Sequence, residues 1–181
     1  TPAFAGDKTL FGKKINYDKI SWYSDLNYFL KLVEKQFRSK VIIIPHPTVR
    51  EFENIYYNKS FYVTKEGDAT NKLISRCKFV LSITPTTAVS YCILYNKPIT
   101  FIFNNQIIKK NYWAYKEMKE LSKMLDVKII NINDAFNNKD IRSSINAKKY
   151  KFYKYEYLTS KKIKNINNVD ILKKIIFNNE K

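Results

Sequence analysis

The sequence predicts an α/β fold: a Rossmann-like, three-layer domain around a mainly parallel sheet of about five strands. Short β-branched runs alternate with segments of helical periodicity throughout residues 21–134. This order favours parallel strands joined by right-handed crossovers. The 181 residues, 45% of them hydrophobic, are also sufficient to bury a core.

Each element follows from its own pattern. Residues 22–37 repeat apolar side chains at helical spacing, with charged residues on the opposite face, which predicts an amphipathic helix. The run VIII at 41–44 has no polar alternation, as is typical of a strand buried on both faces. Further strands are expected at 61–64, 78–83, 97–103 and 127–133, and further helices at 48–57, 69–77, 86–95 and 113–125.

Three segments are expected along the chain. Residues 1–20 lack periodicity and contain two of the three glycines, which favours a linker. Residues 21–134 form the α/β domain. Residues 135–181 form a basic helical extension that packs on it, with helices in AKKYKFYKYEYL and VDILKKII.

The net charge of +17 suggests a polyanionic partner, although a Lys- and Asn-rich composition bias explains it equally simply. Residues 148–181 carry ten lysines against three acidic residues, so this tail can lie against an anionic membrane surface. No run of about 18 apolar residues and no signal peptide is visible. Cys77 and Cys92 lack metal or redox spacing and are expected to be reduced core thiols, which is consistent with a cytoplasmic location.

His46, the only histidine, follows the VIIIP strand. Residues that precede proline are held extended, and Pro47 suits the first turn of a helix. The segment PHPTVREF therefore predicts a strand, a rigid corner and a helix. Since ligands of doubly wound sheets bind outside the carboxyl ends of the strands, His46 is a candidate phosphate ligand. A histidine that is merely packed in the corner is the structural alternative.

A second polar cluster follows another strand. The segment SITPTTAVS places four hydroxyls near a helix start, where unpaired N–H groups and the helix dipole favour an anion such as phosphate. Simple N-capping of that helix by Thr84 or Thr86 is the structural alternative. The four candidate phosphate ligands are Ser82, Thr84, Thr86 and Thr87.

Two further residues at strand ends can contact a sugar or ribose. Glu66 lies in the loop KEGDATNKL, and Asn104 follows TFIF; a solvated loop acid and a turn residue are the respective alternatives. The chain has no GxGxxG, no P-loop and no GxSxG motif, so any phosphate must be held by helix ends, hydroxyls and His46. A single histidine and two scattered cysteines do not predict a metal site.

The order of helix, VIIIPHP, EGD loop, helix and FVLSITPTTAVSYCILYNKPITFIF resembles the C-terminal, donor-binding half of a GT-B glycosyltransferase. It is similar in particular to bacterial capsule and lipopolysaccharide enzymes that use CMP-linked sialic acid or Kdo. Those enzymes carry a His-Pro motif and a later Ser/Thr-rich motif that both face the nucleotide. The resemblance covers roughly residues 20–105.

The resemblance implies an inverting, metal-independent transferase whose donor is a CMP-sugar and which needs no other cofactor. His46 would stabilise the leaving phosphate, and Pro47 would fix the corner. The hydroxyls of Ser82, Thr84, Thr86 and Thr87 would bind phosphate or the sugar carboxylate. Both groups would act on negative charge that grows on the departing nucleotide.

GT-B enzymes use two such domains, and the acceptor and general base belong to the N-terminal one. Since TPAFAGDKTL resembles an interdomain connector, we expect the chain to be a C-terminal piece of a longer protein, inactive alone, whose glycan or lipid-glycan acceptor binds the missing domain. The alternatives are a nucleotide-sugar epimerase-like domain and a basic module that binds nucleic acid or a membrane surface. Nucleic acid is not expected as a partner of the transferase.

Overall fold

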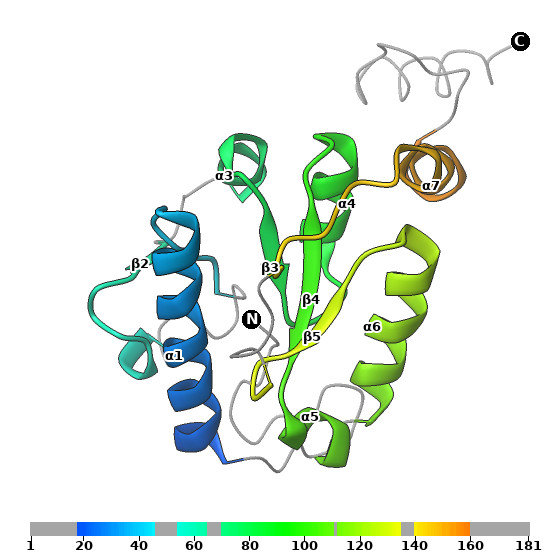
Figure 1. Cartoon of the computed structure of the whole chain (residues 1–181). Helices are drawn as coiled ribbons and strands as arrows, with labels where there is room; N and C mark the ends of the chain where they lie inside the picture. The colour runs from blue at the N-terminus through cyan, green and yellow to red at the C-terminus, as the bar shows by residue number, and fades with distance from the viewer. Residues whose placement is uncertain (1–17, 46–53, 65–69, 111, 135–139, 160–181) are drawn as a thin grey trace, which may run out of the picture.

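The computed structural model describes residues 18–45, 54–64, 70–110, 112–134 and 140–159, and within them the chain is an α/β protein (Figure 1). The elements, in chain order, are α1 (Lys19–Phe37), β1 (Ile42–Ile43), η2 (Asn54–Tyr56), β2 (Tyr62–Val63), α3 (Thr70–Arg76), β3 (Val80–Ser82), α4 (Thr87–Leu94), β4 (Ile99–Phe103), α5 (Asn105–Lys110), α6 (Tyr112–Leu125), β5 (Ile129–Asn131), α7 (Ala147–Tyr153) and η4 (Lys154–Leu158).

The five strands are parallel, as predicted, but they form two sheets instead of one. β1 pairs with β2, and β4 lies between β3 and β5. Among the described residues no backbone hydrogen bond joins β1 to β3. Apolar side chains from both strands and from α1 and α3 line the space between them. The prediction of a single continuous sheet is therefore corrected at this one junction.

The helix α1 covers the first strands with a stripe of apolar side chains. Asp18 caps its first turn by accepting a hydrogen bond from Ser21 N, and the helix ends at Arg38, which has a left-handed φ of 46°. Trp22 is fully buried on its inner face. The predicted amphipathic helix is thus confirmed, with three additional residues at its start.

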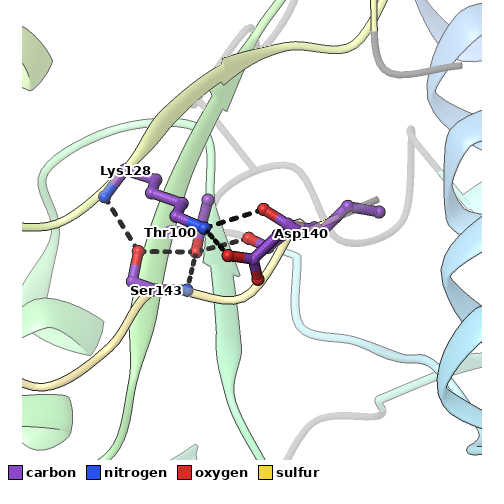
Figure 2. A network of polar contacts seen from close by, with 5 residues as sticks. Thr100, Lys128, Asp140 and Ser143 are labelled. Carbon is purple, nitrogen blue, oxygen red and sulfur yellow. Dashed lines mark hydrogen bonds and ion pairs between the residues drawn. The ribbon is translucent and has the colours of Figure 1, made fainter. Parts of the chain in front are cut away.

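The strand β4 is the centre of the larger sheet. All five of its residues are buried, including Thr100. Thr100 Oγ1 lies 2.9 Å from both Ile141 O and Ser143 Oγ, and it accepts a hydrogen bond from Ser143 N (Figure 2). Lys128 N donates to the same Ser143 Oγ, and Lys128 Nζ pairs with Asp140. This network fixes the segment around residues 140–143 to the sheet.

Most remaining boundaries agree with the predicted ones to within three residues. The helix predicted at 147–158 is present as α7 followed by the π-helical turn η4, whereas α5 was not predicted. Of the predicted helix 48–57, only residues 54–57 lie within the described ranges, and 54–56 form a 3-10 turn. Residues 1–17 and the predicted helix VDILKKII lie outside the described residues.

A search of the described helices for a membrane span finds none with the length and hydropathy required.

Candidate functional site

A pocket of about 510 Å³ separates β1 from β3. It follows both strands along their length, because its lining includes residues 41–45 and 78–83. Side chains of α1 close one side, and residues of α3 and the start of α4 contribute to the lining. A volume of this size lies within the range of about 300–1,000 Å³ that is typical of small-molecule sites.

The strands β1 and β3 run in the same direction along this pocket. At their amino ends Lys78 Nζ donates to Ser39 Oγ at 2.6 Å, and the rings of Phe37 and Phe79 lie 4.7 Å apart. At the opposite end the lining includes Pro45, residues 82–83 and residues 86–88. Both strands therefore end on one side of the pocket.

The pocket also lies where the strand order reverses. From β1 the chain moves outward to β2, and it then returns past β1 to build β3, β4 and β5 on the other side. A reversal of this kind is where open α/β sheets place their ligands. The geometry therefore selects the β1/β3 junction as the candidate site.

The Ser/Thr cluster lies at the carboxyl end of β3, as predicted. Two of its hydroxyls serve local structure: Ser82 Oγ donates to Thr84 O at 2.7 Å, and Thr86 Oγ1 accepts from Ala88 N at 3.3 Å as the cap of α4. Thr87 is exposed and Thr84 is half-buried. Within the described ranges neither of these two hydroxyls makes a hydrogen bond. Thr87 lines the pocket, whereas Thr84 is not among its lining residues.

The other predicted site residues are placed only in part. Pro45 is fully buried and lines the pocket, but His46, Pro47 and Glu66 lie outside the described residues, so their roles stay predictions.

Asn104 is described and fully buried at the end of β4. Its Oδ1 accepts a hydrogen bond from Gln106 N at 3.1 Å, which gives it a structural task at the start of α5. The side chain exposes no surface to a ribose in this structure, and we leave it out of the site.

Thr64, at the carboxyl end of β2, was not among the site residues predicted from the sequence. It follows β2, its N donates to Ile43 O at 2.9 Å, and it is only 2% exposed. Its buried Oγ1 has no hydrogen-bond partner among the described residues. A buried hydroxyl without a partner is uncommon in proteins. The signal available in the sequence was the polar residue at the end of the run FYVT.

The two cysteines lie between the pocket and the core. Cys92 is fully buried, and its burial, with a smaller contribution from Cys77, raises the pKa of its thiol to about 12. Burial also raises the pKa of Cys77, which the nearby Lys97 opposes. Both thiols are unpaired, as predicted, although Cys77 lies one residue beyond α3 and is only half-buried.

Within the described ranges no group of three or more His, Cys, Asp or Glu side chains is placed to hold a metal ion. Comparison of the chain with protein-family models, with curated proteins and with solved structures finds no match.

Proposed function

We propose that the chain is the donor-binding part of an inverting, metal-independent glycosyltransferase of bacterial surface polysaccharide synthesis, with a CMP-sugar as its donor. The single observation that supports this most is the position of the pocket. Its carboxyl end is formed by Pro45, which immediately precedes His46 in sequence, and by Ser82, Thr86 and Thr87 of the Ser/Thr cluster. The two motifs of the resemblance therefore belong to the two strands that flank one pocket.

The proposal includes a doubly wound, Rossmann-like arrangement in which β1 and β3 flank the nucleotide site. The five parallel strands and the reversal of strand order beside the pocket support it. In this arrangement the nucleotide lies across the carboxyl ends of β1 and β3, and the start of α4 faces its phosphate.

The polar groups at this end suit an anion. Thr84 and Thr87 have hydroxyls that no described residue occupies, and α4 directs the positive end of its dipole toward them. In the proposed chemistry these groups hold the donor phosphate, and His46 stabilises the charge that develops as the bond from phosphate to sugar breaks. Catalysis also needs an acceptor and a base, which we assign to a further domain.

Isothermal titration calorimetry of the full chain with CMP, CMP-sialic acid, UDP and GDP tests the proposal. We expect CMP and CMP-sialic acid to bind, and we expect His46→Ala to lose up to a few kcal/mol of binding free energy if its contact is charge-assisted. Binding of none of the four, by a chain with native circular dichroism, would refute the proposal.

Two further variants separate the hydroxyl cluster from the rest of the surface. Thr87→Val should weaken CMP binding by about 1 kcal/mol, because it removes a hydroxyl that no described residue uses. Ser24→Ala on α1 is the matched control: it removes an exposed hydroxyl that does not line the pocket. Equal affinities of the two variants would exclude Thr87 from the site.

A second candidate function is binding of an anionic membrane surface by α7 and η4. The supporting observation is that Phe152 and Tyr157 are each 57% exposed among neighbouring lysines, although Tyr150 packs into the core as an ordinary amphipathic helix requires. Aromatic and basic side chains together suit the boundary between headgroups and acyl chains.

Flotation with phosphatidylglycerol vesicles tests the second function. Binding should decrease steeply with salt and should fall in Phe152→Ser. Preference for an oligonucleotide over the vesicles would instead favour a nucleic-acid module.

A further inference from the structure

Three cations line the amino end of the pocket between β1 and β3, opposite the end assigned to the nucleotide. Lys40 precedes β1, and Arg76 and Lys78 precede β3; all three are exposed. No described carboxylate forms an ion pair with any of them. Lys78 Nζ donates to Ser39 Oγ, which links the two strand entrances.

Glu34 is an acidic side chain whose charge interacts with that of Lys40. Glu34 accepts hydrogen bonds from Lys31 Nζ at 2.8 Å and from Val41 N at 2.9 Å. Burial by itself would raise its pKa, but these bonds and the charges of Lys31 and Lys40 lower it. The carboxylate is thus ionised and is engaged by Lys31 and Val41. Of the three cations at this pocket end, Lys40 contributes to the lowered pKa of Glu34, whereas Arg76 and Lys78 do not.

Behind these cations most of the residues that line the pocket are apolar. One stripe of α1 supplies Leu26, Leu30 and Val33, and α3 supplies Leu73 and Ile74. The inner parts of β1 and β3 contribute further β-branched and leucine side chains. A hydrocarbon chain placed against these walls would be stabilised, because the contact removes apolar surface from water.

We propose that this pocket binds an anionic amphiphile with a single hydrocarbon chain. The chain lies between β1 and β3, and the acidic headgroup lies against Lys40, Arg76 and Lys78. The charge of the cations selects an anionic headgroup, and the absence of an ion pair among the described residues leaves them available for it. A carboxylate and a phosphate monoester share this chemistry, so a fatty acid and a lipid phosphate are both suitable sources.

A chain of polar contacts joins this pocket end to the surface of α7. Lys97 Nζ donates to Cys77 O at 3.0 Å, and Tyr150 of α7 donates through its OH to Lys97 O at 3.1 Å. In Figure 1, α3 and α7 lie at one end of the molecule, and α5 lies at the other. The pocket end that carries the cations and the exposed Phe152 thus lie at the same end of the molecule. A ligand that enters the pocket from a membrane surface would require this arrangement.

This proposal does not rest on nucleotide binding, because the headgroup lies at the amino ends of the strands and the nucleotide at their carboxyl ends. Its test uses ligands without a nucleotide. Laurate, dodecyl phosphate and uncharged 1-dodecanol share a chain length and differ in headgroup. Each is titrated below its micelle concentration against the full chain carrying a fluorescent fatty acid, with inorganic phosphate as the headgroup alone.

We expect laurate and dodecyl phosphate to bind at least about tenfold more tightly than 1-dodecanol in the displacement titration, since a single hydrogen bond to a charged group can account for a factor of that size. Inorganic phosphate should not displace it. The preferred anion then identifies the source: stronger binding of laurate indicates a free fatty acid, and stronger binding of dodecyl phosphate indicates a lipid phosphate.

Variants test the two ends of the ligand separately. The double variant Lys40→Gln with Arg76→Gln should bind both anionic ligands about tenfold more weakly, and its affinity for 1-dodecanol should be unchanged. Lys119→Gln with Lys123→Gln on α6 removes the same charge from exposed positions and should change nothing. Leu73→Trp should weaken the binding of all three ligands, because the larger side chain fills the pocket. If this variant fails to fold, the smaller change Ala88→Leu serves the same purpose.

Three results would overturn the proposal. The first is absence of saturable displacement by any of the three chains. The second is equal binding of 1-dodecanol and laurate, or an equal loss of affinity for the anionic ligands in the pocket double variant and in the α6 double variant. The third is a crystal structure in which β1 and β3 are hydrogen-bonded to each other and the pocket is closed.

Discussion

The two sheets of this protein differ in how completely they are built. β4 has neighbours on both sides, five buried residues and a buried polar network, whereas β1 pairs with β2 over two residues and faces a pocket on its other side. Both sheets are formed by apolar, β-branched segments of the sequence. The larger sheet therefore acts as a scaffold. At the β1/β3 junction, space remains between the side chains, and a ligand can bind there.

Core truncation should separate the two sheets most clearly. Ile102→Ala in β4 removes a side chain that is 1% exposed and should cost about 2–5 kcal/mol in the free energy of unfolding. Ile42→Ala in β1 removes one that is 47% exposed and should cost under about 1 kcal/mol. Urea denaturation measures both, and equal losses would remove the distinction between scaffold and site.

Two buried threonines give a sharper contrast. Thr100→Val removes the hydroxyl that joins Ile141 and Ser143 to the sheet, so it should cost about 1–3 kcal/mol. Thr64→Val replaces a buried hydroxyl that makes no hydrogen bond to the part of the chain that the structure describes, so stability should be unchanged or slightly higher.

The same denaturation series measures both threonine variants. A destabilisation by Thr64→Val as large as that by Thr100→Val would show that the hydroxyl of Thr64 has a partner in the folded protein.

The pH dependence of stability should report the link between α1 and β1. Folding lowers the pKa of Glu34 below its ordinary value of 4.5, so its ionised form stabilises the fold above that pH. This contribution is lost as the pH falls through the folded-state pKa. Glu34→Gln should therefore cost roughly 1 kcal/mol at pH 7 and much less near pH 3. A pH-independent difference would contradict this assignment.

The smallest expected effect concerns thiol reactivity. With iodoacetamide at pH 8 the native protein should react slowly at Cys77 and hardly at all at Cys92, whose pKa is about 12. Peptide mass spectrometry distinguishes the two sites. Faster modification of Cys92 would show that the core beside the pocket opens.

Periodicity predicted most of the fold because each pattern reports the environment of its own segment. The apolar stripe of α1 and the buried run of β4 are such local signals. The split between β1 and β3 is not local, because it depends on how side chains of α1 and α3 meet between two strands. The helix α5 was missed because Asn104 and Asn105 suggested a turn, whereas Asn104 Oδ1 accepts the hydrogen bond of Gln106 N in the first turn of α5.

The site was predictable in position more than in detail. Hydroxyls after a strand indicated the edge at which Ser82 and Thr87 lie, because parallel strands end at a shared edge. Which hydroxyls remain available depends on local hydrogen bonds: those of Ser82 and Thr86 are taken. The cations at the other pocket end could not be distinguished in the sequence from the many other basic residues. Lys40 and Arg76 are far apart in the sequence, and the fold brings both to one pocket.

The most direct test of the account is an NMR titration of the isotopically labelled chain with CMP. We expect the largest amide shift changes at Ser82, Thr84 and residues 86–88, with little change at the exposed face of α6. Changes confined to α6 or α7, or no change at millimolar CMP in a folded chain, would contradict a nucleotide site at the carboxyl ends of β1 and β3.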